Sequence, residues 1–155
     1  MKKLLLSILA LGTPLITVQA APGKATFLPP GSKERKAVLD ALRKPVERNV
    51  KQTVVFYEVK VRTKSNWAYV QAVPRNSQGK TLKAFDPDTE PAVIGLLKKQ
   101  GNTWKVLYFG FGTSMDPVSE ARHKYPKAPR SLFPSLPGEF PGDGSYGGNG
   151  FNNHD

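Results

Sequence analysis

The sequence predicts an α+β fold, with one amphipathic helix packed across a four-stranded antiparallel meander. Three observations support it. In Ala92–Gly112, two apolar runs flank a Gly-Asn turn, which is the pattern of a β-hairpin. A second pair of apolar runs flanks Lys64-Ser65-Asn66, and a helical stripe of apolar residues precedes both pairs. The expected element order is therefore helix, hairpin, long connection, hairpin and a short C-terminal helix.

The first 20 residues have the pattern of a bacterial signal peptide. Lys2 and Lys3 precede the apolar run Leu4–Leu11, and Val18-Gln19-Ala20 has small residues where a signal peptidase requires them. The run is shorter than the roughly 18 residues that a membrane span needs. The chain has no cysteine, so neither a lipid anchor at the cleavage point nor a disulfide is expected. We expect cleavage near Ala20 and a periplasmic or secreted protein without a membrane span.

An extended lead-in, Ala21–Gly31, is expected before the first helix because it contains five Pro or Gly residues that break regular structure. Ser32 can cap the helix N-terminus with its hydroxyl. Pro45 is expected to end the helix at about Lys44. The residues that make its apolar stripe are Val38, Ala41 and Leu42.

The predicted strands of the first hairpin are Thr53–Thr63 and Trp67–Val73. A long polar connection then runs to the central hairpin. Since both faces of the hairpin's second strand are largely apolar, we expect that strand inside the sheet, with a neighbour on each edge. Asp116-Pro117 is a typical helix start, and the helix cannot extend past Tyr125 because proline follows.

The C-terminal part divides into two segments. Pro126–Pro137 is rich in proline and is expected to be an irregular strap that docks through its apolar side chains. Gly138–Asp155 has six glycines and no apolar periodicity, so we expect a disordered tail. A single α+β domain is thus predicted over residues 32–137.

Several residues of the hairpins carry a family resemblance: Trp67-Ala68, Leu96-Leu97, Trp104, Val106 and Gly112-Thr113. With this element order, the chain resembles small secreted bacterial domains of unknown function. More distantly it is similar to cystatin-like and nuclear transport factor 2-like folds, in which a helix lies across a curved antiparallel sheet. The resemblance implies a fold and no catalytic residue. The enzymes of the second group have additional N-terminal helices around a deep cavity, and this chain is expected to have one helix there.

The residues typical of catalytic or metal sites are few. His123 stands between two cations, where Glu120 could pair with it on a helix surface, and an orienting partner for a general base is not evident. Asp86, Asp88 and Glu90 are interpreted as a solvated loop, because a calcium loop would need a turn glycine and a terminal bidentate acid. We predict no catalytic residue, metal or cofactor.

The net charge of +11 is the strongest indication of function. Six cations from the two hairpins form the candidate binding set: Lys60, Arg62, Lys64, Lys98, Lys99 and Lys105. Aromatic residues of the strands lie near them in sequence. Nucleic acid is not expected as the partner of an exported protein, and the charge could serve only solubility. The leading hypothesis is a non-enzymatic exported binding or accessory domain. Its partner would be an anionic envelope polymer, anionic lipid headgroups or an acidic protein. The alternative is a small hydrolase or isomerase with a shallow pocket between helix and sheet.

Overall fold

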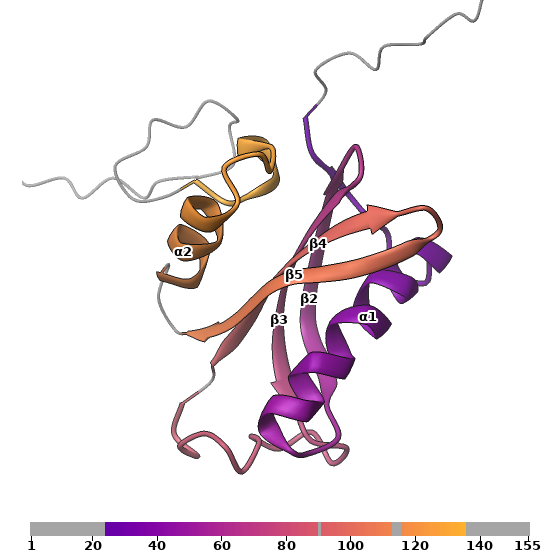
Figure 1. The fold of residues 1–155 in the computed structure, drawn as a ribbon. Coiled ribbons are helices and arrows are strands. Elements are labelled where there is room, and N and C mark those ends of the chain that lie inside the picture. The colour runs from indigo at the N-terminus through magenta and orange to yellow at the C-terminus, as the bar shows by residue number, and fades with distance from the viewer. Residues whose placement is uncertain (1–23, 90, 113–115, 136–155) are drawn as a thin grey trace, which may run out of the picture.

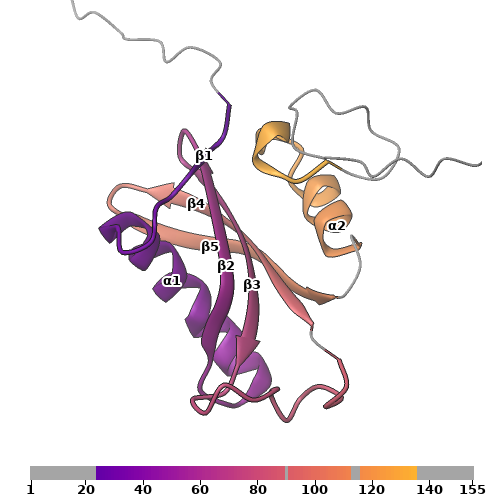
Figure 2. The same cartoon turned by 180° about the vertical axis from the view of Figure 1, so that it is seen from behind.

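The computed structural model describes residues 24–89, 91–112 and 116–135. It is an α+β fold built on a five-stranded antiparallel sheet in the order β1-β2-β3-β4-β5 (Figures 1 and 2). The elements in chain order are β1 (Thr26–Phe27), α1 (Lys33–Val50), β2 (Val55–Lys64), β3 (Trp67–Arg75), β4 (Ala92–Gln100), β5 (Thr103–Gly112), α2 (Asp116–Lys124) and the 3-10 turn η1 (Arg130–Leu132). The predicted signal peptide and the predicted tail Gly138–Asp155 lie outside the described residues.

The prediction of four strands was wrong by one, because part of the expected lead-in pairs with the sheet. Thr26 and Phe27 lie opposite Thr63 and Arg62 and form β1 at the edge of β2. The guanidinium of Arg35 on α1 fixes this segment: it donates to the Leu28 carbonyl at 3.0 Å and to the Val59 carbonyl at 2.8 Å. The N-terminal segment is therefore bound to both α1 and β2.

The prediction that Pro45 ends the first helix was also wrong, since α1 continues to Val50. A proline inside a helix removes one backbone hydrogen bond and costs about 3 kcal/mol. Val46, one position later, is fully buried, and burial of a valine stabilises by roughly 2 kcal/mol. Val50 extends the same stripe and packs on the core. Tertiary packing thus offsets much of the cost of the proline.

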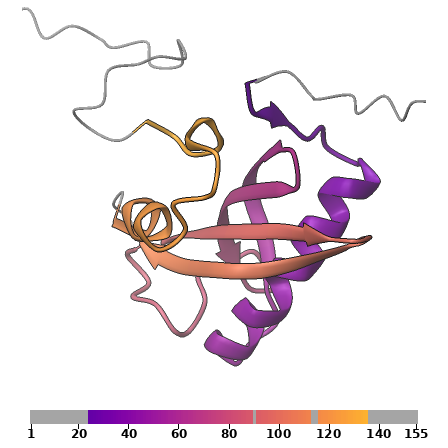
Figure 3. The same ribbon diagram turned by 45° about the horizontal axis from the view of Figure 1, so that its top comes forward.

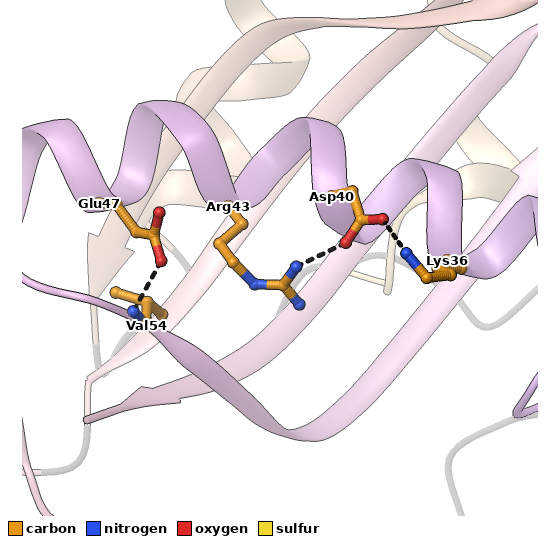
Figure 4. A network of polar contacts seen from close by, with 5 residues as sticks. All are labelled: Lys36, Asp40, Arg43, Glu47 and Val54. Atoms are coloured by element: carbon orange, nitrogen blue, oxygen red, sulfur yellow. Dashed lines mark hydrogen bonds and ion pairs between the residues drawn. The ribbon is translucent and has the colours of Figure 1, made fainter. Parts of the chain in front are cut away.

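Both ends of α1 are closed by hydrogen bonds. Ser32 accepts from the Arg35 amide at 3.2 Å, as expected for its capping role. At the other end Lys51 adopts φ 53, and its N–H bonds to the Glu47 carbonyl. The Glu47 carboxylate accepts from the Val54 amide at 2.9 Å, which links the helix to the start of β2 (Figure 4). No described helix is both long and apolar enough to cross a membrane.

The sheet has an apolar cluster on each face. On the first face, α1 packs against all four long strands, and the cluster includes Val38, Leu42, Val61, Val70, Leu97 and Trp104. Gly95 lets α1 approach β4 closely, because a Cβ there would lie 2.8 Å from a methyl group of Leu42. On the second face, α2 and the strap cover a cluster that includes Trp67, Tyr69, Ile94, Leu96, Leu132 and Phe133. The expected docking of the strap through Leu132 and Phe133 is confirmed within the described residues.

The prediction that the second strand of the central hairpin lies inside the sheet was wrong. This strand, β5, lies at the edge of the sheet. Its two faces are apolar because α1 covers one and α2 the other. A β-bulge accounts for the pattern: Leu97 pairs with Val106, but Leu96 pairs with Tyr108, which leaves Leu107 as the extra residue. The bulge reverses the alternation, so that Phe109 joins the cluster beneath α1.

Candidate ligand-binding surface

The strand register aligns three of the six candidate cations in one row. Lys64 on β2 lies opposite Trp67 on β3, Trp67 lies opposite Lys98 on β4, and Lys98 lies opposite Lys105 on β5. Directly paired residues of an antiparallel sheet point to the same face. The row therefore crosses four strands on the face that carries α2, next to the turns of both hairpins.

Two more cations belong to the same face. Lys60 and Arg62 precede Lys64 at intervals of two residues on β2, and the register keeps them on that face. We call these five residues the basic face: Lys60, Arg62, Lys64, Lys98 and Lys105. Lys99, the sixth candidate, points to the opposite face, where it forms a 2.7 Å ion pair with Glu34 on α1. Its ammonium also lies 5.5 Å from the Trp104 ring centroid.

Part of the basic face is engaged with the protein itself. Arg62 donates to the Phe133 carbonyl at 3.3 Å, and Lys64 donates to the Ser131 hydroxyl at 3.0 Å. The Lys98 ammonium lies 5.0 Å from the centroid of the Trp67 ring. Lys60 and Lys105 are exposed, and neither side chain has a hydrogen bond, ion pair or ring contact among the described residues. Arg62 and Lys64 thus hold the strap, while Lys60, Lys98 and Lys105 can face a ligand.

Most of the strand aromatics near these cations in sequence are buried. Trp67, Tyr69 and Trp104 are at most 8% exposed, because α2, the strap and α1 cover them. The Tyr69 hydroxyl is buried without a hydrogen-bond partner among the described residues, and burial raises its pKa above the usual value. Exposed aromatics on this face include Phe27 of β1, which is 55% exposed and lies under Arg62 at 4.8 Å, and Tyr57 of β2, which is 42% exposed and pairs with Val73. A two-residue strand has too little pattern to be recognised from sequence.

A groove follows the outer edge of β5 between the two helices and has a volume of about 860 Å³. Residues 102–109 form its floor, α1 forms one bank and α2 contributes to the other. Figure 3 shows the hairpin of β4 and β5 crossing α1, with α2 at the end away from the turn. The cations that line this edge groove are Lys44, Arg48, Lys105 and Lys124.

The acidic groups of the edge groove are already paired. Asp40 accepts from Lys36 at 2.6 Å and from Arg43 at 2.5 Å, as Figure 4 shows, and the Lys36 hydrogen bond lowers its pKa. Glu120 accepts from the Tyr108 hydroxyl at 2.8 Å. Burial, together with Glu120, raises the pKa of Tyr108 to about 12, so this phenol stays neutral at ordinary pH.

The remaining candidate residues, His123 and the acidic cluster at Asp86, form neither a catalytic pair nor a metal site among the described residues. His123 is exposed, and Glu120 pairs with Tyr108, not with it. The Asp86 carboxylate accepts from the Asp88 amide at 3.0 Å, as in a simple turn, while Glu90 is outside the described residues. Among the described residues no group of three or more His, Cys, Asp or Glu side chains could hold a metal ion.

Comparison with known proteins gives no family for the chain: no family model, curated protein or solved structure matches it. The cystatin-like and nuclear transport factor 2-like resemblance therefore stays a prediction.

Proposed function

We propose that this chain is an exported, non-enzymatic binding or accessory domain whose basic face binds an anionic component of the cell envelope. The supporting observation is the alignment of Lys64, Lys98 and Lys105 in one row across four strands. Neighbouring strands lie about 4.8 Å apart. Lys98 and Lys105, on adjacent strands, are therefore roughly 5 Å apart at the backbone, and Lys64 and Lys98, two strands apart, are roughly 10 Å apart. Such spacing suits a ligand with repeated negative charges better than a single small anion.

A second point supports a multivalent ligand. The fold holds Arg62 and Lys64 in place through the strap, and Lys98 through the Trp67 ring. Side chains that are already ordered lose less entropy when a ligand binds. A polyanion would therefore meet a basic face that is partly arranged in advance, on which Lys60 and Lys105 are the freer side chains.

Inorganic polyphosphate is a suitable probe, because binding driven by counterion release depends steeply on salt. The test compares Lys60→Gln/Lys98→Gln with the matched control Lys80→Gln/Lys83→Gln, whose lysines are exposed on the connection between β3 and β4. Each lost contact should make the log–log salt slope shallower by about 0.7, the value for single-stranded nucleic acid. The first variant should therefore lose roughly 1.4 units of slope, and the control should lose little.

The control also separates function from solubility. Both variants remove two positive charges, so a loss that depends only on net charge would be equal in the two. Equal slopes and equal affinities would overturn the proposal. The alternative of a hydrolase or isomerase gains no specific support from the edge groove, whose acids are both paired.

A further inference from the structure

The outer edge of β5 has no neighbouring strand among the described residues. β5 is the last strand of the sheet, and eight consecutive residues, 102–109, line the edge groove. Successive side chains of a strand point to opposite faces. A groove lined by all of them must follow the backbone edge itself and not one face of the sheet.

The direction of the backbone groups along this edge follows from the hairpin. The two-residue turn is closed by the pair Gln100–Thr103, and Gly101 has the positive φ, 58°, that such a turn needs. In a hairpin with a two-residue turn the closing pair is hydrogen-bonded, and non-hydrogen-bonded and hydrogen-bonded pairs alternate beyond it. The pairs of Trp104 and Val106 are non-hydrogen-bonded in this alternation. The next residue, Trp104, and then Val106 therefore direct their N–H and C=O groups outward, into the groove.

The groove has the charge of a site for an acidic ligand. Lys44, Arg48, Lys105 and Lys124 are all exposed, and none of the four has a hydrogen bond or ion pair within the described part of the chain. Its acids, Asp40 and Glu120, are both engaged. Apolar residues such as Ala41, Val106 and Leu107 also line the groove. An occupant that alternates acidic and apolar residues would match both features.

The same charges argue against a second copy as the occupant. Two copies that paired edge to edge would bring two sets of these four cations together, and like charges across an interface disfavour association. A lysine in the edge strand and a β-bulge are also features by which proteins prevent pairing between identical edges. These features disfavour pairing with the β5 edge of a second copy, whereas the charge of the edge is complementary to an acidic strand.

We propose that the free edge of β5 binds an extended acidic segment of a partner polypeptide, which adds to the sheet as a further strand between α1 and α2. The main-chain bonds of Trp104 and Val106 would supply affinity, and the surrounding cations would select acidic sequences. This site is separate from the polyanion site proposed above and does not depend on it. Lys105 borders both, so it is left unchanged in the tests.

The first test uses a fluorescein-labelled, acetylated nine-residue peptide that alternates glutamate with valine and threonine. We expect Lys44→Gln/Arg48→Gln to weaken its binding about five- to tenfold, while Lys80→Gln/Lys83→Gln stays within twofold of the unchanged protein. A twin peptide, N-methylated at its central amides, keeps the side chains and charge but cannot donate to β5. It should bind at least tenfold more weakly. Equal binding of the two peptides, or equal loss in the two variants, would overturn the proposal.

The second test reads the edge directly through amide hydrogen exchange of the full chain. The acidic peptide should slow exchange at Trp104 and Val106 while the polyphosphate probe does not. Without peptide, exchange at these amides that becomes slower as the protein concentration increases, together with a rise in the molar mass of the protein in solution, would show an interface between copies. Faster exchange there after removal of residues 136–155 would show that the chain's own C-terminal segment occupies the edge. Either result would contradict a partner polypeptide as the occupant.

Discussion

Replacement of Trp104 by alanine tests the packing of α1 on the sheet. The ring is 6% exposed and belongs to the cluster beneath α1, so nearly all of its roughly 250 Å² is removed from water. At about 25 cal/mol per Å² this burial contributes about 6 kcal/mol. Alanine retains part of this area, and the unfolded chain already shields some of it. Measured tryptophan and phenylalanine truncations in cores cost 3–5 kcal/mol, and we expect about 4 kcal/mol here.

Urea denaturation followed by far-UV circular dichroism gives this loss directly, and fluorescence of Trp67 supplies a second probe in the variant. Trp104→Phe is the control, because it keeps a large apolar side chain and should lose less than half as much stability. A loss below about 1 kcal/mol for Trp104→Ala would show that the ring is not part of the core. It would contradict the burial of the ring between α1 and the sheet.

Three further predictions concern other contacts. Gly95→Ala should cost about 1–3 kcal/mol of unfolding free energy in urea denaturation, because the new methyl group would overlap Leu42. In a double-mutant cycle, Gly95→Ala should cost less when Leu42→Ala has already removed that overlap. Arg35→Lys should cost about 1–2 kcal/mol in the same assay, since one ammonium cannot replace a guanidinium that donates to two carbonyls, and an unchanged midpoint would contradict this. Because its pKa is raised to about 12, the contribution of Tyr108 to stability is present below about pH 10 and is lost as pH rises toward 12. The tyrosinate that forms near pH 12 in an ultraviolet titration should be missing in Tyr108→Phe, and an unchanged titration would contradict the assignment.

The sequence was informative where local patterns and tertiary packing agree. Apolar runs around Lys64-Ser65-Asn66 and around Gly101 predicted the two hairpins, and the structure confirms both. It was misleading where packing overrides a local signal, as at Pro45, or where a strand is as short as Thr26–Phe27. The edge position of β5 was missed because apolar residues on both faces can reflect two covering helices as well as two neighbouring strands.

The candidate surface was predictable only in part. A period of two places Lys60, Arg62 and Lys64 on one face of any strand. Whether Lys98 or Lys99 joins them depends on the pairing of β3 with β4, and no local pattern fixes that register. The edge groove depends on the bulge at Leu107 and on the position of α2, which are both tertiary features.

Chemical-shift mapping with polyphosphate tests the central claim, that the strand register creates one anion-binding face. Titration of the isotope-labelled chain should shift the resonances of Lys60, Lys98 and Lys105 together and leave Lys99, paired with Glu34 on the other face, unchanged. Exposed lysines elsewhere, such as Lys80, should also stay unchanged. Shifts spread evenly over the exposed lysines of both faces would contradict the claim and leave net charge alone as the cause of binding.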